Sequence, residues 1–467
     1  MKEKKDAVKE LKEKLFLNRK NGYRLINEDE ENMISVFAED YRRFLDTAKT
    51  EREAVCEAVR ILESNGFTEY RKGMELKAGD RIYRNNRGKA VVTAVIGTAP
   101  IDEGVRLCAA HIDSPRLDLK QNPLYEDNEL ALFKTHYYGG IKKYQWTAIP
   151  LSLHGVIVKA DGDTVTVNIG EDDNDPIFCV TDLLPHLATE QMNRNATKII
   201  RGEDLNILIG SVPFKDDESG EAVKLNIMHI LFEKYGITES DFISAELEAV
   251  PAFRSRDLGF DRSLIGGYGH DDRCCAFPAL MATVNCQNPV HTAVTVLTDK
   301  EETGSDGNTG LCSAYLNYFI EDIAEALGSD GRTVLSASEC LSADVNAAFD
   351  PTFAEVNERY NCAYVNKGVC ITKYTGARGK AGTSDASAEF AGRIRRLMDR
   401  ENVIWQTGEL GKVDEGGGGT VAAYIANLNV DTIDMGVPVL SMHAPFEVIS
   451  KLDLYMAYKA FSVFISD

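Results

Sequence analysis

Short apolar runs alternate with helical patterns through the second half of the chain, and this alternation constrains the fold more than any other feature. The segments between the runs carry apolar residues at the 3–4 spacing of a helix. Such alternation predicts an α/β fold: a mixed, mostly parallel sheet with helices on both faces. The expected strands are residues 291–299, 333–345 and 431–440, and the expected helices are residues 270–284, 308–327 and 384–399.

The first half of the chain has a different pattern. Residues 120–248 are rich in hairpin signals and acidic loops, which predicts a β-rich domain inserted into a main domain of residues 1–119 and 249–467. Within it, two β-branched runs around Asp-Gly-Asp predict a hairpin over residues 151–172. Before it we expect helices over residues 1–17 and 30–64, and strands over residues 89–97 and 105–113.

The charge and the cysteines exclude several classes of protein. Lys and Arg number 52 and Asp and Glu 73, so the formal charge is −21 and nucleic acid phosphates would be repelled. No run approaches the roughly 20 apolar residues that span a bilayer. The N-terminal segment mixes acids and bases around no apolar centre, so we expect no secretory signal. Ten scattered cysteines without a C-x-x-C pair indicate free thiols in a reducing cytoplasm.

Two histidines follow apolar runs, where α/β sheets place their ligands. His111 follows VRLCAA and begins H-I-D-S-P, and His443 follows DMGVPVLSM and begins H-A-P. Either one alone could be a histidine hydrogen-bonded in a turn. Acidic residues occupy similar places: Glu301 and Glu302 follow VTVLTDK, and Asp344 follows SECLSA. A carboxylate buried at such a position without a cation would be costly.

Asp271 and Asp272 stand between a glycine-rich segment and an expected helix. One of them may serve only as the helix N-cap. Imidazole and carboxylate without thiolate suit zinc, manganese or cobalt, and indicate a catalytic site, with a spare glutamate as general base. Tyr137, Tyr138 and Trp146 are expected in the core, and the glycines of 416–419 form either a flexible turn or a loop that approaches a substrate.

Ordered blocks along most of the chain resemble the aspartyl aminopeptidase family of co-catalytic zinc metallopeptidases. AAHIDSPRLDLK is similar to the family's A-H-x-D-S-P block, and LPHLATEQMNRN to its P-H-L-A block. The blocks DKEETGS, SADVNAAFDP, NKGV, WQTGEL, GGGGT and DMGVPVLSMHAPFEV follow in the family's order. The resemblance implies a zinc-exopeptidase-like fold and an aminopeptidase acting on short peptides with a free N-terminus.

The resemblance also implies a role for each matching residue. It implies two divalent cations per subunit, zinc or otherwise cobalt or manganese. Glu301 would be the general base, and Asp113 would orient His111. One cation would be bound by His111 and Asp344, the other by Glu302 and His443, with Asp271 bridging the two.

The chain departs from the family pattern in its specificity residues. Two histidines of the family's D-M-A-H-A-x-H-P block are replaced by Ala347 and Asp350, and a histidine expected after P-H-L-A by Glu190. A lysine expected after N-K-G falls on Thr372, with Lys373 one place along. These changes indicate a bacterial branch whose preference for acidic N-terminal residues is altered. The resemblance leaves Lys367, Lys373, Gly418 and His186 as candidate substrate-binding residues.

The family's assembly is a tetrahedral dodecamer built from dimers, with the inserted domain making the dimer contacts and acting as a lid. The sequence itself permits a dimer as readily. Two other functions stay open at this point. One is a related metal-dependent amidohydrolase or carboxypeptidase, and the other is a catalytically silent assembly protein.

Overall fold

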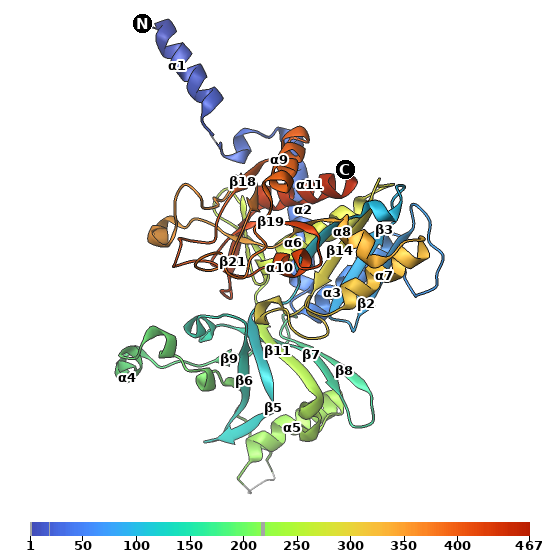
Figure 1. Cartoon of the computed structure of the whole chain (residues 1–467). Coiled ribbons are helices and arrows are strands. Elements are labelled where there is room, and N and C mark those ends of the chain that lie inside the picture. Colours follow the sequence, from blue (N-terminus) through green and yellow to red (C-terminus); the bar gives the residue numbers. More distant parts are fainter. Residues whose placement is uncertain (1, 18, 216–219) are drawn as a thin grey trace.

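A nine-stranded mixed sheet forms the centre of the molecule (Figure 1). The computed structural model describes residues 2–17, 19–215 and 220–467. Within the sheet, β14, β4, β15 and β19 are neighbours and run parallel, while β3 and β17 pair antiparallel on either side. In spatial order the strands are β1 (Thr68–Glu69), β2 (Arg81–Asn86), β3 (Ala90–Val95), β14 (Thr292–Thr298), β4 (Val105–His111), β15 (Glu339–Ser342), β19 (Asp431–Gly436), β17 (Val369–Thr372) and β18 (Trp405–Thr407).

Helices cover both faces of this sheet, as the alternating pattern predicts. Successive residues of β4 point to opposite faces: Cys108 and Ala110 lie in one apolar cluster, and Leu107 and Ala109 in another. The first cluster packs under α2 (Glu28–Thr47), α3 (Glu51–Ser64), α6 (His270–Asn285), α9 (Ala388–Arg400) and α11 (Lys451–Ser466). The second packs under α7 (Tyr315–Ala326), α8 (Gly331–Ser336) and α10 (Ala422–Ala426).

A second sheet of seven antiparallel strands lies below the first in Figure 1. It has its own apolar core around the fully buried Trp146. The predicted hairpin is confirmed as β7 and β8, while the domain boundaries at 120 and 248 stay a prediction. In spatial order its strands are β8 (Thr164–Ile169), β7 (Leu151–Val158), β11 (Ala245–Pro251), β5 (Arg116–Asp127), β6 (Leu130–Tyr138), β10 (Ile207–Gly210) and β9 (Cys179–Val180), with α4 (Thr189–Met192) and α5 (Ala222–Tyr235) in its connections.

A third sheet completes the fold and carries the loop that holds His443. It has the strand order β12 (Arg256–Leu258), β13 (Leu264–Gly267), β21 (Glu447–Ser450), β20 (Pro438–Leu440) and β16 (Asn346–Ala347).

Helix α1 (Lys2–Leu15) extends away from the rest of the chain (Figure 1). No helix among the described residues is long and apolar enough to cross a bilayer.

Two sequence predictions of element boundaries are wrong because of helix caps. The expected strand over 333–345 begins instead as α8, because the Asp330 side chain accepts hydrogen bonds from the N–H groups of Arg332 and Thr333. Only Glu339–Ser342 is strand. The expected helix over 30–64 is divided into α2 and α3, because Thr50 starts a new helix with a capping box.

Replacing Thr50 by alanine is expected to lower the stability of the protein by about 1 kcal/mol, the usual cost of losing an N-cap. The Thr50 hydroxyl accepts from the Glu53 N–H, and a Glu53 carboxylate oxygen accepts from the Thr50 N–H at 3.1 Å. The shift in the urea midpoint of unfolding measures the loss. Thr47→Ala is the matched control, since Thr47 bonds only to the Arg43 carbonyl within α2. Equal midpoints for the two variants would contradict the capping role.

Candidate metal centre

Three neighbouring parallel strands end at one edge of the large sheet and bring polar side chains together there. Strand β4 ends at His111, which pairs in register with Thr298 at the end of β14. Glu301 and Glu302 follow β14 in a short 3-10 helix, and Asp344 lies two residues beyond the end of β15. Parallel strands place their carboxyl ends on the same side, so the sheet itself gathers these four residues.

Two other elements complete the cluster. Asp271 and Asp272 lie at the start of α6, and His443 lies in the loop between β20 and β21, three residues after the end of β20. One carboxylate oxygen of Asp271 is 3.1 Å from Nε2 of His111, and the other is 3.2 Å from Nε2 of His443. Oε2 of Glu302 is 3.5 Å from the same His443 nitrogen. Asp271 therefore lies between the two imidazoles and offers one oxygen to each.

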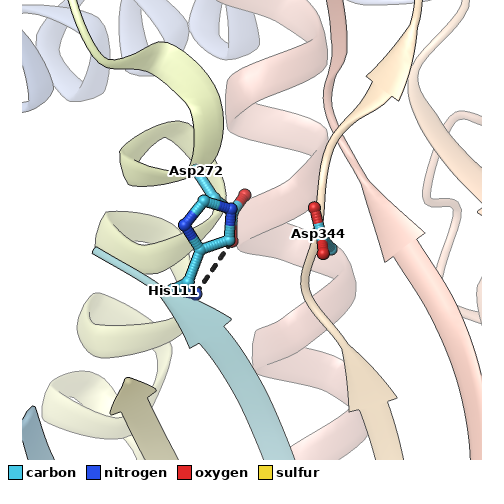
Figure 2. Close-up of side chains that lie close together, drawn as sticks. All are labelled: His111, Asp272 and Asp344. Carbon is cyan, nitrogen blue, oxygen red and sulfur yellow. Dashed lines mark hydrogen bonds between the residues drawn. The ribbon is translucent and has the colours of Figure 1, made fainter. Parts of the chain in front are cut away.

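The ligand atoms fall into two groups, each spanning less than 4.8 Å. Asp271, Glu302 and His443 form one group, and His111, Asp272 and Asp344 form the other. Figure 2 shows the second group, with His111 at the end of its strand and the two aspartates coming from different elements. The His111 N–H donates to Oδ2 of Asp272 at 3.2 Å. The five ligands expected from the family resemblance are thus in one place, and Asp272 joins them.

Both imidazoles are oriented as metal ligands are. Nδ1 of His443 is 2.8 Å from the Gly140 carbonyl oxygen, and Nδ1 of His111 is 3.1 Å from that of Asp113. A cation bound at Nε2 of either histidine requires the tautomer in which Nδ1 carries the hydrogen, and the two carbonyl oxygens lie where that Nδ1–H would donate.

Several carboxylates are buried close together, and cations would stabilise them. Burial, reinforced by neighbouring carboxylates, raises the pKa of Asp344 and that of Glu302 well above their ordinary values. Asp344 Oδ2, Glu302 Oε1 and Asp272 Oδ1 are buried without a hydrogen-bond partner in the part of the chain that the structure describes. Unpartnered buried oxygens of this kind are costly unless a cation binds them. The mixed nitrogen and oxygen donors fit zinc, and fit manganese or cobalt also.

Asp113 and Glu301 lie beside these groups. The two oxygens of Asp113 accept from the N–H groups of Glu301 and Glu302, at 3.1 and 3.2 Å. The Glu301 carboxylate lies 3.9 Å from Nε2 of His111 and keeps part of its surface exposed. Burial raises the pKa of Glu301 to about 7, with Asp271 and Asp113 adding to the shift. A pKa near neutrality suits a group that accepts and returns a proton.

Sequence reasoning missed three residues around the centre. Glu447 is buried and accepts from the N–H groups of His443 at 2.9 Å and Asp271 at 3.2 Å, so it ties two candidate ligands together. Its place four residues after His443 in the same block was the available signal. Of the pair Asp271 and Asp272, only Asp271 was given a role in the cluster, and Asp272 was not. Tyr138 was expected in the core, but its hydroxyl donates to Asp113.

The four candidate substrate-binding residues have the following described surroundings. Nζ of Lys367 donates to the Arg19 carbonyl, Lys373 lines a pocket of about 690 Å³, and His186 is exposed in a short 3-10 helix. The Gly418 carbonyl accepts from Gly376. Among the interactions described for residues 2–17, 19–215 and 220–467, none joins these four to the cluster, and their substrate roles stay a prediction.

The chain was compared with known families and structures. The family profile "Aminopeptidase I zinc metalloprotease (M18)" matches residues 44–465. "Probable M18 family aminopeptidase 1" from Clostridium acetobutylicum is 51% identical over 449 residues, which are 94% of this chain and 97% of that protein. The crystal structure of an M18 aminopeptidase from Thermotoga maritima is 44% identical with a TM-score of 0.93, covering 97% of this chain and 100% of the other. The structure of the S. cerevisiae mApe1 dodecamer shares the fold at 19% identity, with a TM-score of 0.75 and coverage of 93% and 97%.

Proposed function

This chain belongs to the M18 family of zinc metalloproteases and is a metallo-aminopeptidase, and we propose that its buried cluster binds two divalent cations. The position of Asp271, with one oxygen toward each imidazole, carries this proposal. A carboxylate that bridges two cations needs that arrangement. The proposed ligands are His111 and Asp344 for one cation, Glu302 and His443 for the other, and Asp271 for both.

Glu301 acts as the general base in this proposal. When bound, the cations lower the pKa of water and polarise the carbonyl of the scissile bond. Glu301 accepts a proton from the attacking water and then passes it to the nitrogen of the leaving peptide. Asp113 fixes the position of Glu301, because it accepts from the N–H group of that residue. The position of the Glu301 carboxylate, partly exposed and 3.9 Å from Nε2 of His111, supports this role.

The substrates are short peptides with a free N-terminus. Membership of an aminopeptidase family supports this proposal, because an aminopeptidase acts at an unblocked N-terminal amine. The predicted specificity residues determine which N-terminal side chain the enzyme prefers. A panel of aminoacyl substrates measures this preference.

We further propose a tetrahedral dodecamer in the cytoplasm. The mApe1 structure of the same fold is a dodecamer, and all ten cysteines of this chain are free thiols, as in a reducing compartment. Light scattering on the purified protein should give twelve times the mass of one chain. A dimer would contradict the larger assembly.

Metal analysis and a substrate panel test the activity together. We expect about two equivalents of zinc, manganese or cobalt per chain, and cleavage of chromogenic Asp, Glu, Leu or Lys derivatives that stops when the metal is chelated. Each derivative is paired with its N-acetylated form. An aminopeptidase releases the chromophore only from the free-amine member of each pair, whereas an N-acyl amidohydrolase would release acetate from the blocked one, which chromatography of the products detects. Fewer than two equivalents in a fully active enzyme would remove the dinuclear proposal.

A further inference from the structure

The Asp113 carboxylate is the point where several parts of the centre meet. Its Oδ1 accepts from the Glu301 N–H and lies 3.4 Å from Nδ1 of His111, and its Oδ2 accepts from the Glu302 N–H. One carboxylate therefore orients the proposed base and one proposed ligand, and lies beside a second, His111. Asp113 is fully buried, so its own orientation has to be set by protein groups.

Tyr138 supplies a further contact to that carboxylate, from the other sheet. Its hydroxyl donates to Oδ2 of Asp113 at 2.7 Å. Tyr138 is the last residue of β6, whereas Asp113 follows β4 of the large sheet. Burial, together with the Asp113 charge, raises the pKa of Tyr138 far above its ordinary value, so the hydroxyl keeps its proton and remains a donor.

Arg116 packs against the face of the Tyr138 ring. The two residues are direct partners across β5 and β6, and the guanidinium carbon lies 3.9 Å from the ring centroid. This distance is typical of a strong cation–π contact. Arg116 is itself buried and paired with Glu51 and Glu248 at 3.2 Å, and with Asp118 at 2.8 Å. The ring therefore has little freedom to leave Asp113.

We propose that Tyr138 is a positioning residue for peptide hydrolysis, which holds the Asp113 carboxylate and through it the Glu301–Glu302 turn beside His111. The inference rests on the proposed function. Tyr138 contacts Asp113 and not the proposed cations, so it acts through another residue. Without its hydroxyl, Oδ2 of Asp113 keeps only the Glu302 N–H among the hydrogen bonds described for it. The seven-stranded sheet thereby becomes part of the catalytic machinery.

Tyr138→Phe removes the one hydroxyl and keeps the ring on Arg116. We expect a loss of about 10–100-fold in metal affinity or in kcat, the usual range for outer partners of metal ligands, with KM little changed. Metal affinity is measured by competition with a chelator and kcat with a free-amine chromogenic substrate. The matched control is Tyr137→Phe, which loses the same atom one residue earlier, from a side chain that is 39% exposed. Equal thermal midpoints of the two variants exclude a general loss of fold.

A double-mutant cycle separates positioning from a merely structural effect. In an Asp113→Asn background, Tyr138→Phe should cause little further loss, because both changes remove the same link. If the double variant instead lost activity by the product of the two single losses, the inference would be overturned. It is also overturned if Tyr138→Phe matches Tyr137→Phe in both kcat and metal affinity while the parent enzyme binds its metals. A parent enzyme that binds no divalent cation would instead remove the proposed function itself.

Discussion

Glu301→Gln should lower kcat by about 10²–10⁴-fold, the range that general acid–base groups contribute, while the metal content stays unchanged. Glutamine keeps the size of the side chain and the backbone N–H that donates to Asp113, but it cannot accept the proton of water. In our assignment Glu301 binds no cation, so its loss affects the chemical step alone. Metal analysis and steady-state kinetics on the same preparation measure the two quantities.

The neighbouring glutamate is the matched control for this experiment. Glu302→Gln makes the same chemical change one residue along, but at a side chain 3.5 Å from His443 Nε2 that we assign as a ligand. It should lose metal as well as activity, so the two variants differ in metal content. A Glu301→Gln enzyme with the parent rate, or one that had lost its metals, would show that the roles of the two glutamates are assigned wrongly.

Asp271→Ala should abolish binding of both cations, and with it nearly all activity. Each oxygen of this carboxylate faces a different imidazole, so the substitution removes a proposed ligand from both cations. We expect kcat/KM to fall by at least about 10⁴-fold. Enzymes usually accelerate reactions by about 10⁶-fold or more, so a loss of this size is within what the metal centre can contribute. Metal content should fall from about two equivalents toward zero.

Asp272→Asn is the control for Asp271→Ala and also tests the grouping in Figure 2. The amide oxygen of asparagine can still accept from the His111 N–H, as Asp272 does now. We therefore expect this variant to retain both cations. Loss of one cation from Asp272→Asn, with both retained in Asp271→Ala, would make Asp272 the ligand and exclude the bridging role.

The sequence predicted the part of the site that depends on strand ends. His111 and the pair Glu301–Glu302 directly follow apolar runs, and parallel strands present such residues at one edge. The fold class followed from the same alternation, and the similar structure from Thermotoga maritima supports it. Helix boundaries were less predictable, because the single caps at Asp330 and Thr50 changed the structure against the hydrophobic pattern.

Other parts of the site required contacts between distant segments. Glu447 had no predicted role, yet its buried carboxylate joins the backbones of His443 and Asp271. This contact forms only when α6 and β21 lie side by side, because Asp271, whose N–H bonds to Glu447, is 176 residues away from it in the sequence.

The sequence by itself determined the donor types of this centre and the strand ends that present them, because the order of apolar and polar residues is local information. Only the tertiary structure decided that one oxygen of Asp271 faces each imidazole and that Tyr138 of a different sheet reaches Asp113. Those contacts depend on how the sheets and α6 pack against one another. No periodicity within a single segment encodes that packing.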